Sequence, residues 1–134
     1  MKTWLTAYAA VAVAFFALDF AWLSQMAGTF YRERIGVFLA DSPNIPAAAV
    51  FYFLYVFGIV WFAVAPALDA GSWTKALVSG ALFGLLAYAT YDLTNMATLK
   101  QWPLSLTLVD MAWGAFATGV AATVGYWVTR SVNG

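Results

Sequence analysis

Four long apolar runs dominate the sequence, at about residues 3–26, 45–65, 73–97 and 104–129. An α-helix rises about 1.5 Å per residue, so about 20 apolar residues cross the hydrocarbon core of a membrane. Only 9% of the residues are charged and 64% are hydrophobic, which is more apolar surface than a soluble fold of 134 residues could bury. Backbone groups in lipid must be satisfied within helices. The sequence therefore predicts an all-α, integral membrane four-helix bundle in one transmembrane domain.

Proline and serine mark where these helices are expected to begin and end. Pro46 falls in the first turn of the second helix, where its missing N–H would have no helical partner. Pro66 is expected to end that helix, and Ser72 is placed to cap the third. Pro103 opens the fourth helix. The short connection between the second and third helices predicts that they are antiparallel neighbours.

Residues 29–41, between the first two runs, mix apolar and charged side chains. Arg32, Glu33 and Arg34 form one side, while aromatic and aliphatic residues recur near helical spacing on the other. This pattern fits a short helix in the membrane interface, with the arginines reaching to lipid headgroups. An ordinary polar connector fits it equally well, and both interpretations stay open.

Small residues predict where helices pack closely. Gly80 and Gly84 form a small-xxx-small pair in the third helix, and Ala117, Ala121 and Gly125 offer a seam on the fourth. The second helix has no charged residue and is rich in aromatic side chains. We interpret those aromatic residues as a lipid-facing or packing surface.

The composition excludes several kinds of chemistry. The chain has no cysteine and no histidine, which rules out disulfides, thiol nucleophiles, imidazole bases and most zinc, copper and haem sites. The formal net charge is zero, which argues against nucleic acid as a partner. No cofactor is expected and no metal site is assigned. Three carboxylates together with Asn95 would still offer oxygen ligands to a divalent cation.

Three aspartates fall inside predicted membrane helices: Asp19 in the first, Asp92 in the third and Asp110 in the fourth. Four spans put both termini on one side of the membrane, and all three acids lie toward the opposite, far side. Each is roughly 8 to 10 Å inside the far end of its helix. An intramembrane carboxylate is costly and normally faces a bundle interior or a wet cavity. The three acids are therefore expected to share one pocket.

The acids of the first and fourth helices stand in similar sequence frames. A tryptophan follows Asp19 at Trp22, and another follows Asp110 at Trp113, in each case one turn on and on the same helix face. The two frames read Leu-Asp-Phe-Ala-Trp and Val-Asp-Met-Ala-Trp. Internal duplication and chance both explain so short a similarity.

Further polar residues cluster around the third acid. Tyr88, Asp92 and Asn95 share one helix face by their i, i+4, i+7 spacing, and Lys100 is the cation nearest to them in sequence. No catalytic residue is assigned. The candidate pocket residues are Asp19, Trp22, Tyr88, Tyr91, Asp92, Asn95, Lys100, Asp110 and Trp113.

Two roles are open for the acids. As buried hydrogen-bonding groups that hold helices together, they would contribute about 0.6 to 2 kcal/mol per pair. One aspartate at the centre of a membrane helix costs about 2.5–3.5 kcal/mol, so a functional polar pocket is favoured. Clustered carboxylates in an apolar site repel one another. At least one is expected to keep its proton, and Asp92 is the first choice because it lies in the densest polar stretch.

The chain resembles a family of small bacterial membrane proteins, domain of unknown function 2177. The resemblance covers nearly the whole chain. It implies a four-helix protein of the bacterial inner membrane and carries no activity with it. The residues that support it are Leu18-Asp19-xx-Trp22-Leu23, Gly80-xxx-Gly84, Tyr88-Ala89-Thr90-Tyr91-Asp92-Leu93-Thr94-Asn95-xx-Thr98-Leu99-Lys100-xx-Trp102-Pro103 and Asp110-xx-Trp113-Gly114.

Three classes of function remain open. The first is proton- or cation-linked binding or transport of a small or hydrophobic solute, for which four helices would need to assemble as a homo-oligomer. The second is a membrane enzyme or accessory protein that acts on a lipid or fatty-acyl substrate. The third is a structural or regulatory partner of another membrane protein, docking through the aromatic second helix. The lipid bilayer is an expected partner in all three classes, and the ligand of the first two is a small molecule or a lipid.

The orientation in the membrane depends on few charges. The cations divide equally, with Lys2, Lys75 and Arg130 on the terminal side and Arg32, Arg34 and Lys100 on the far side. A lysine at position 2 is hard to translocate ahead of a first helix. Glu33 and Asp41 add negative charge to the far side. These features favour cytoplasmic termini.

Four spans make a direct prediction about the two ends of the chain. Single cysteines introduced at positions 2 and 132 are expected to react with a membrane-impermeant maleimide from the same face of the membrane. The native chain has no cysteine, so no background labelling competes. Labelling of the two positions from opposite faces would contradict the four-span topology.

Overall fold

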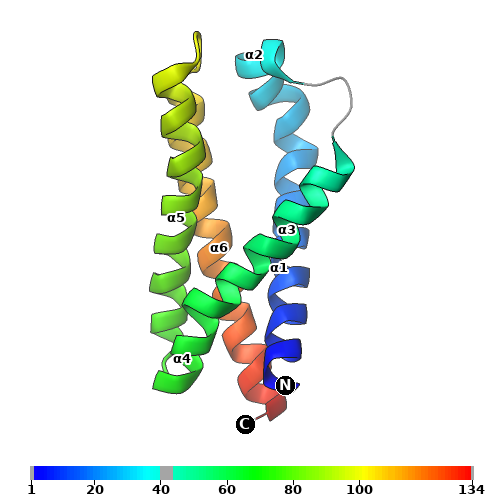
Figure 1. Cartoon of the computed structure of the whole chain (residues 1–134), viewed down its shortest axis with the longest axis vertical. Coiled ribbons are helices and arrows are strands. Elements are labelled where there is room, and N and C mark those ends of the chain that lie inside the picture. Colours follow the sequence, from blue (N-terminus) through cyan, green and yellow to red (C-terminus); the bar gives the residue numbers. More distant parts are fainter. Residues whose placement is uncertain (1, 40–43, 134) are drawn as a thin grey trace.

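Four continuous helical stretches run through the computed structural model, which describes residues 2–39 and 44–133 (Figure 1). They cover Lys2–Phe38, Ile45–Ala70, Trp73–Thr98 and Leu104–Asn133, and each is long and apolar enough to cross a membrane. The prediction of an all-α, four-helix integral membrane protein is confirmed. The side chain of Asn133 donates a hydrogen bond to Thr3 Oγ1 over 3.1 Å, so the two ends of the chain meet at one end of the bundle.

The first stretch continues well beyond its apolar run. α1 (Lys2–Met26) passes through a π-helical turn, Ala27–Tyr31, into α2 (Arg32–Ile35) and a 3-10 turn, Gly36–Phe38. The segment for which an interfacial helix and a polar connector were both open is therefore helical from residue 29 to residue 38. Residues 40–43, which include the end of that segment and the start of the expected turn, lie outside the described residues.

α2 lies at the end of the bundle away from both termini (Figure 1). Ile35 is buried there against Trp102 and Leu106, at the start of the fourth stretch. Arg34 Nε donates to Ser105 Oγ over 3.0 Å. At least one of the two arginines expected to reach headgroups therefore binds the neighbouring helix instead.

The second stretch does not end at Pro66, and that prediction is wrong. Proline has no N–H for the carbonyl four residues earlier, and its ring crowds the preceding turn. A π-helical turn, Val60–Val64, follows α3 (Ile45–Ile59) and widens the helix directly before the proline. Pro66 then occupies the first turn of α4 (Ala65–Ala70), where its missing N–H costs little.

Gly71 ends the second stretch. Its φ of 64° is a left-handed conformation that glycine adopts without strain. The N–H of Gly71 bonds to the carbonyl of Leu68, and that of Ser72 to the carbonyl of Ala67, which together form a Schellman motif. The Ser72 hydroxyl then accepts from Lys75 N and caps α5 (Trp73–Thr98), as the sequence predicted.

α6 (Leu104–Asn133) is the central helix, with small residues on two faces. Gly80 and Gly84 of α5 pack directly on one face, where a Cβ on either glycine would clash with α6. Ala121 on another face is fully buried in the main core, and Gly125 packs against Val11 of α1. The predicted small-residue pair on α5 and the seam on α6 are therefore both packing surfaces, but they serve different neighbours.

The main core lies in the half of the bundle near the termini and at its middle. It includes Val11 and Phe15 of α1, Ile59 of α3 and Ala121 of α6, all with 0% exposure. α3 crosses the bundle obliquely, so that its first turns lie beside α1 at the α2 end and α4 reaches α5 at the other (Figure 1). The first turns of α3 are consequently exposed, apart from side chains such as Tyr52 that face inward.

The close contact of α5 with α6 predicts a large cost for any side chain at Gly84. A Cβ there would meet the carbonyl oxygen of Gly114 and the side chain of Thr118. Because a backbone carbonyl cannot move aside, Gly84→Ala should lower the free energy of unfolding by about 1–3 kcal/mol. Thermal unfolding in detergent micelles measures this cost. Gly28→Ala is the control, since nothing lies within 4 Å of its Cβ position, and equal stability of the two variants would contradict the close contact.

Candidate functional site

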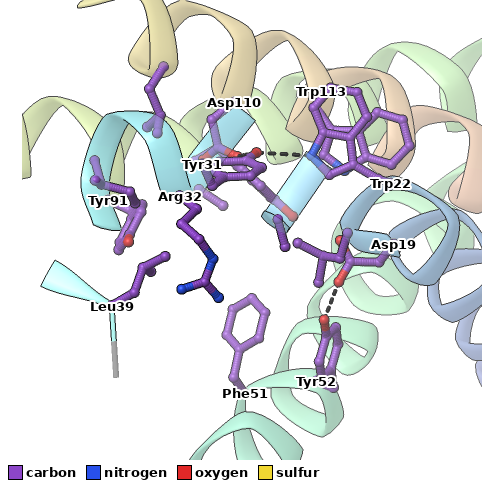
Figure 2. Close-up of a pocket in the computed structure, with 16 residues that line it drawn as sticks. Asp19, Trp22, Tyr31, Arg32, Leu39, Phe51, Tyr52, Tyr91, Asp110 and Trp113 are labelled. Carbon is purple, nitrogen blue, oxygen red and sulfur yellow. Dashed lines mark hydrogen bonds between the residues drawn. The ribbon is translucent and has the colours of Figure 1, made fainter. Parts of the chain in front are cut away.

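A cavity of about 500 Å³ opens in the half of the bundle that carries α2 (Figure 2). Its walls come from α1, the π-helical turn after it, α2, α3, α5 and α6. The lining is mostly apolar and aromatic, with two aspartates and one arginine. The lining residues are Asp19, Trp22, Leu23, Ala27, Tyr31, Arg32, Ile35, Leu39, Phe51, Tyr52, Ala87, Tyr88, Tyr91, Leu106, Asp110 and Trp113.

Asp19 forms one polar wall of the cavity. Its side chain is 8% exposed and accepts a hydrogen bond from the hydroxyl of Tyr52 on α3. The Tyr52 ring packs on Phe15 and Phe16 of α1, with ring centroids 6.1 and 4.8 Å away. The aromatic contacts hold the hydroxyl against the carboxylate, so Asp19 is satisfied by a partner from a different helix.

Asp110 forms the opposite polar wall. The Tyr31 hydroxyl donates to Asp110 Oδ1 over 2.5 Å, and Trp22 Nε1 donates to the Tyr31 oxygen over 2.9 Å. A hydroxyl that donates to a carboxylate makes a stronger bond than one between two neutral groups. The π-helical turn that carries Tyr31 thus connects α1 to α6 through two consecutive hydrogen bonds.

The two similar sequence segments, one around Asp19 on α1 and one around Asp110 on α6, lie against each other through their tryptophans. The indoles of Trp22 and Trp113 stack with centroids 4.3 Å apart and an interplanar angle of 8°. α1 and α6 run in opposite directions, so the carboxylates one turn before each indole point to different sides of the stack (Figure 2). Asp19 and Asp110 therefore face one cavity from two sides, and each accepts from its own tyrosine.

Asp92 lies behind the cavity wall instead of in it. Its side chain is fully buried, and neither carboxyl oxygen has a hydrogen-bond partner among residues 2–39 and 44–133. The acidic group next to Asp92 is Asp110, across the contact between α5 and α6. The hydroxyls of Tyr31 and Tyr91 are also close enough to Asp92 to interact with its carboxyl group electrostatically. The three acids were expected to share one pocket. Instead, Asp92 and Asp110 are neighbours, and Asp19 lies across the cavity from Asp110.

The remaining expected pocket residues divide into two groups. Tyr88 and Tyr91 line the cavity, and Tyr88 packs its ring on Gly114. Asn95 and Lys100 are not among the lining residues, and Lys100 is exposed. Lys100 is the cation nearest to Asp92 in the sequence, but it follows the end of α5 at Thr98 and does not face the cavity.

The cation that faces the cavity is Arg32. Its side chain lines the cavity, and its guanidinium points toward the ring of Phe51 (Figure 2). Sequence reasoning placed Arg32 either at lipid headgroups or in a polar connector, and did not include it among the pocket residues. It also left Tyr31 and Tyr52 out of the pocket. A tyrosine within an apolar run is the signal that would have found them, since its hydroxyl needs a partner when it is buried.

This arrangement can bind a molecule but shows no assembled reaction centre. In the parts of the chain that the structure describes, no cluster of three acidic residues is close enough to hold a metal ion. No serine, threonine or lysine lies among the lining residues to act as an activated nucleophile. What the cavity offers is aromatic surface, two tyrosine-bonded carboxylates and a guanidinium.

Comparison with known proteins gives one positive finding. A family model described as "Predicted membrane protein (DUF2177)" matches residues 4–127. No curated protein and no solved structure matches the chain. The matched residues include every member of the cavity lining.

The tyrosine bonds predict unequal effects of removing two hydroxyls from the cavity. Tyr31→Phe should lower the free energy of unfolding by about 1.5–3 kcal/mol, because Asp110 loses a charge-assisted bond and Trp22 loses its acceptor. Tyr91→Phe is the matched control, since the Tyr91 hydroxyl makes no hydrogen bond within the described residues and should change stability by less than about 0.5 kcal/mol. Chemical unfolding in micelles measures both. Equal effects would contradict the assigned bonds.

Proposed function

Because the chain belongs to the DUF2177 family of predicted membrane proteins, and crosses the membrane in four helices, we propose that it binds a hydrophobic or amphiphilic molecule taken from the bilayer. The cavity next to α2 is the binding site. The observation that supports this most strongly is the division of its lining into an apolar rim and a polar interior. That division fits a ligand with an apolar part and a polar part.

The exposed part of the lining is apolar and aromatic apart from Arg32. It comes from α1, the end of the first helical stretch, the first turns of α3 and the later half of α5. In a bilayer these side chains would face acyl chains. A ligand could therefore enter sideways from the lipid. The exposed apolar and aromatic members are Leu23, Leu39, Phe51 and Tyr91, with 42%, 39%, 48% and 54% exposure.

The buried part of the lining is polar enough to orient a ligand. Asp19 and Asp110 are each 8% exposed and face the cavity from two sides, and the exposed side chain of Arg32 lines the same cavity. Ligand sites in proteins usually combine an apolar enclosure with a few placed polar groups of this kind. We propose that the polar part of the ligand lies among these three residues while its apolar part extends past Phe51.

Transport would need more than one copy in the conformation described here. The half of the bundle nearer the termini is filled by the main core, with Phe15, Ile59 and Ala121 fully buried. That packed core lies between the cavity and the terminal side. We therefore propose binding as the function of the single chain, and a homo-oligomer as the form in which any transport would occur.

Filling the cavity tests the proposed site. A photoactivatable phospholipid or fatty acid in the membrane should cross-link to peptides that contain Phe51 and Tyr91. Ala87 lines the cavity, so Ala87→Trp should reduce these cross-links by about tenfold or more, because an indole would occupy the space of the ligand. Mass spectrometry of the digested protein measures the yield at each site.

Leu86→Trp is the matched control, since Leu86 is 57% exposed and is not part of the cavity lining. It should leave the cross-links at Phe51 and Tyr91 unchanged. Cross-links spread evenly over all lipid-facing helices, with the same pattern in both variants, would contradict a specific binding site.

A further inference from the structure

Asp92 is a buried carboxyl group that the proposed binding site alone does not explain. It is fully buried, and both of its oxygens lack a hydrogen-bond partner in the described part of the chain. Its neighbour Asp110 does face the cavity. A group with this burial and no donor is expensive when charged. Its side chain approaches the ligand site from behind the Asp110 wall.

Asp92 and Asp110 are not paired with a cation in the part of the chain that the structure describes, where the only ion pair joins Glu33 and Arg34. The ionisable groups beside Asp92 are Asp110 from α6, Tyr31 from the π-helical turn and Tyr91 from its own helix. Arg32 lines the cavity that Asp110 faces, and its exposed side chain is the cation nearest to the pair among the lining residues. Two adjacent carboxyl groups in an apolar environment repel each other when both are ionised, which favours a state in which they share one proton.

The cavity in front of the pair is suited to a positive ligand. Aromatic rings attract cations through their negative faces, and sites for organic ammonium groups combine such rings with carboxylates. Asp110 has one oxygen bonded to Tyr31, and its second oxygen accepts from no donor within the described residues. The aromatic side chains of the lining are Trp22, Tyr31, Phe51, Tyr52, Tyr88, Tyr91 and Trp113.

We propose that the ligand of this cavity is a lipophilic organic cation, an ammonium group on an apolar chain, which binds at Asp110 in exchange for the proton held by the Asp92–Asp110 pair. This inference rests on the proposed function of the cavity as a binding site. One positive charge enters as one proton leaves to water, so the net charge of the site is unchanged. Arg32 is the exposed cation of the lining, and its long side chain can stay at the rim while the ammonium group binds deeper, at Asp110.

Two probes with the same tail and opposite charge test the charge of the ligand. Decyltrimethylammonium and decyl sulfate are titrated into the full chain in maltoside micelles, with empty micelles as the blank. The ammonium probe should bind, and its apparent Kd should fall by up to about tenfold per pH unit as the pH rises, because protons compete with it. A pH-indicator dye in weak buffer should report about one proton released per bound cation. Decyl sulfate should release none.

Substitutions of the pair separate exchange from simple binding. Asp92→Asn should still bind the ammonium probe but release no proton, and its binding should lose the pH dependence. Asp110→Asn should weaken binding by about tenfold or more, because the carboxylate that meets the cation is gone. Asp69→Asn, on an exposed acid at the other end of the bundle, should behave as the native chain.

Three outcomes would overturn the inference. In the first, the ammonium probe binds the native chain without releasing protons, or Asp92→Asn releases as many protons as the native chain. In the second, only decyl sulfate binds, and Arg32→Gln abolishes that binding, which would assign an anionic ligand to Arg32. In the third, neither probe binds although lipid cross-linking still depends on Ala87, which would leave the proposed binding function standing and exclude the cationic ligand.

Discussion

The close approach of α5 and α6 is the contact on which the rest of the structure depends. Lipid chains are as apolar as leucine, so helices in a membrane gain little from hydrophobic burial and associate through van der Waals packing. Glycines at positions 80, 84 and 114 remove the side chains that would hold the two backbones apart. The same approach brings Asp92 of α5 beside Asp110 of α6 and removes both from lipid.

Two π-helical turns explain how a cavity forms beside such a tight pair. The turn after α1 places Tyr31 where its hydroxyl meets Asp110, which holds α2 over the end of the bundle. The turn before Pro66 lets the second stretch continue to α4 and pack on α5, although α3 crosses at an angle. π-Helical turns are frequent at functional sites because the extra residue redirects side chains without ending the helix. The cavity occupies the space that the oblique α3 leaves open near α2.

Sequence reasoning reached the architecture because lipid restricts the choices so strongly. Four apolar runs of sufficient length have to be helices, and rise per residue fixes the depth of each aspartate. Depth alone does not fix rotation about a helix axis. For that reason Asp92 was grouped with Asp19 and Asp110 in one pocket, whereas its side chain lies behind the wall. Arg32 was missed for a related reason, since its direction depends on the π-helical turn that precedes it, and no residue type in Ala27–Tyr31 predicts that turn.

The three aspartates differ in how far structural roles account for them. Asp19 and Asp110 each accept a tyrosine hydroxyl from another segment, and such bonds recover part of the cost of burying a carboxylate. A role in holding helices together is therefore a sufficient explanation for those two residues. Asp92 makes no side-chain hydrogen bond to any residue that the structure describes, and it is the most deeply buried of the three. An apolar residue of similar size would pack there at lower free energy, so Asp92 is the residue whose presence calls for a function, and its acidic neighbour Asp110 faces the cavity.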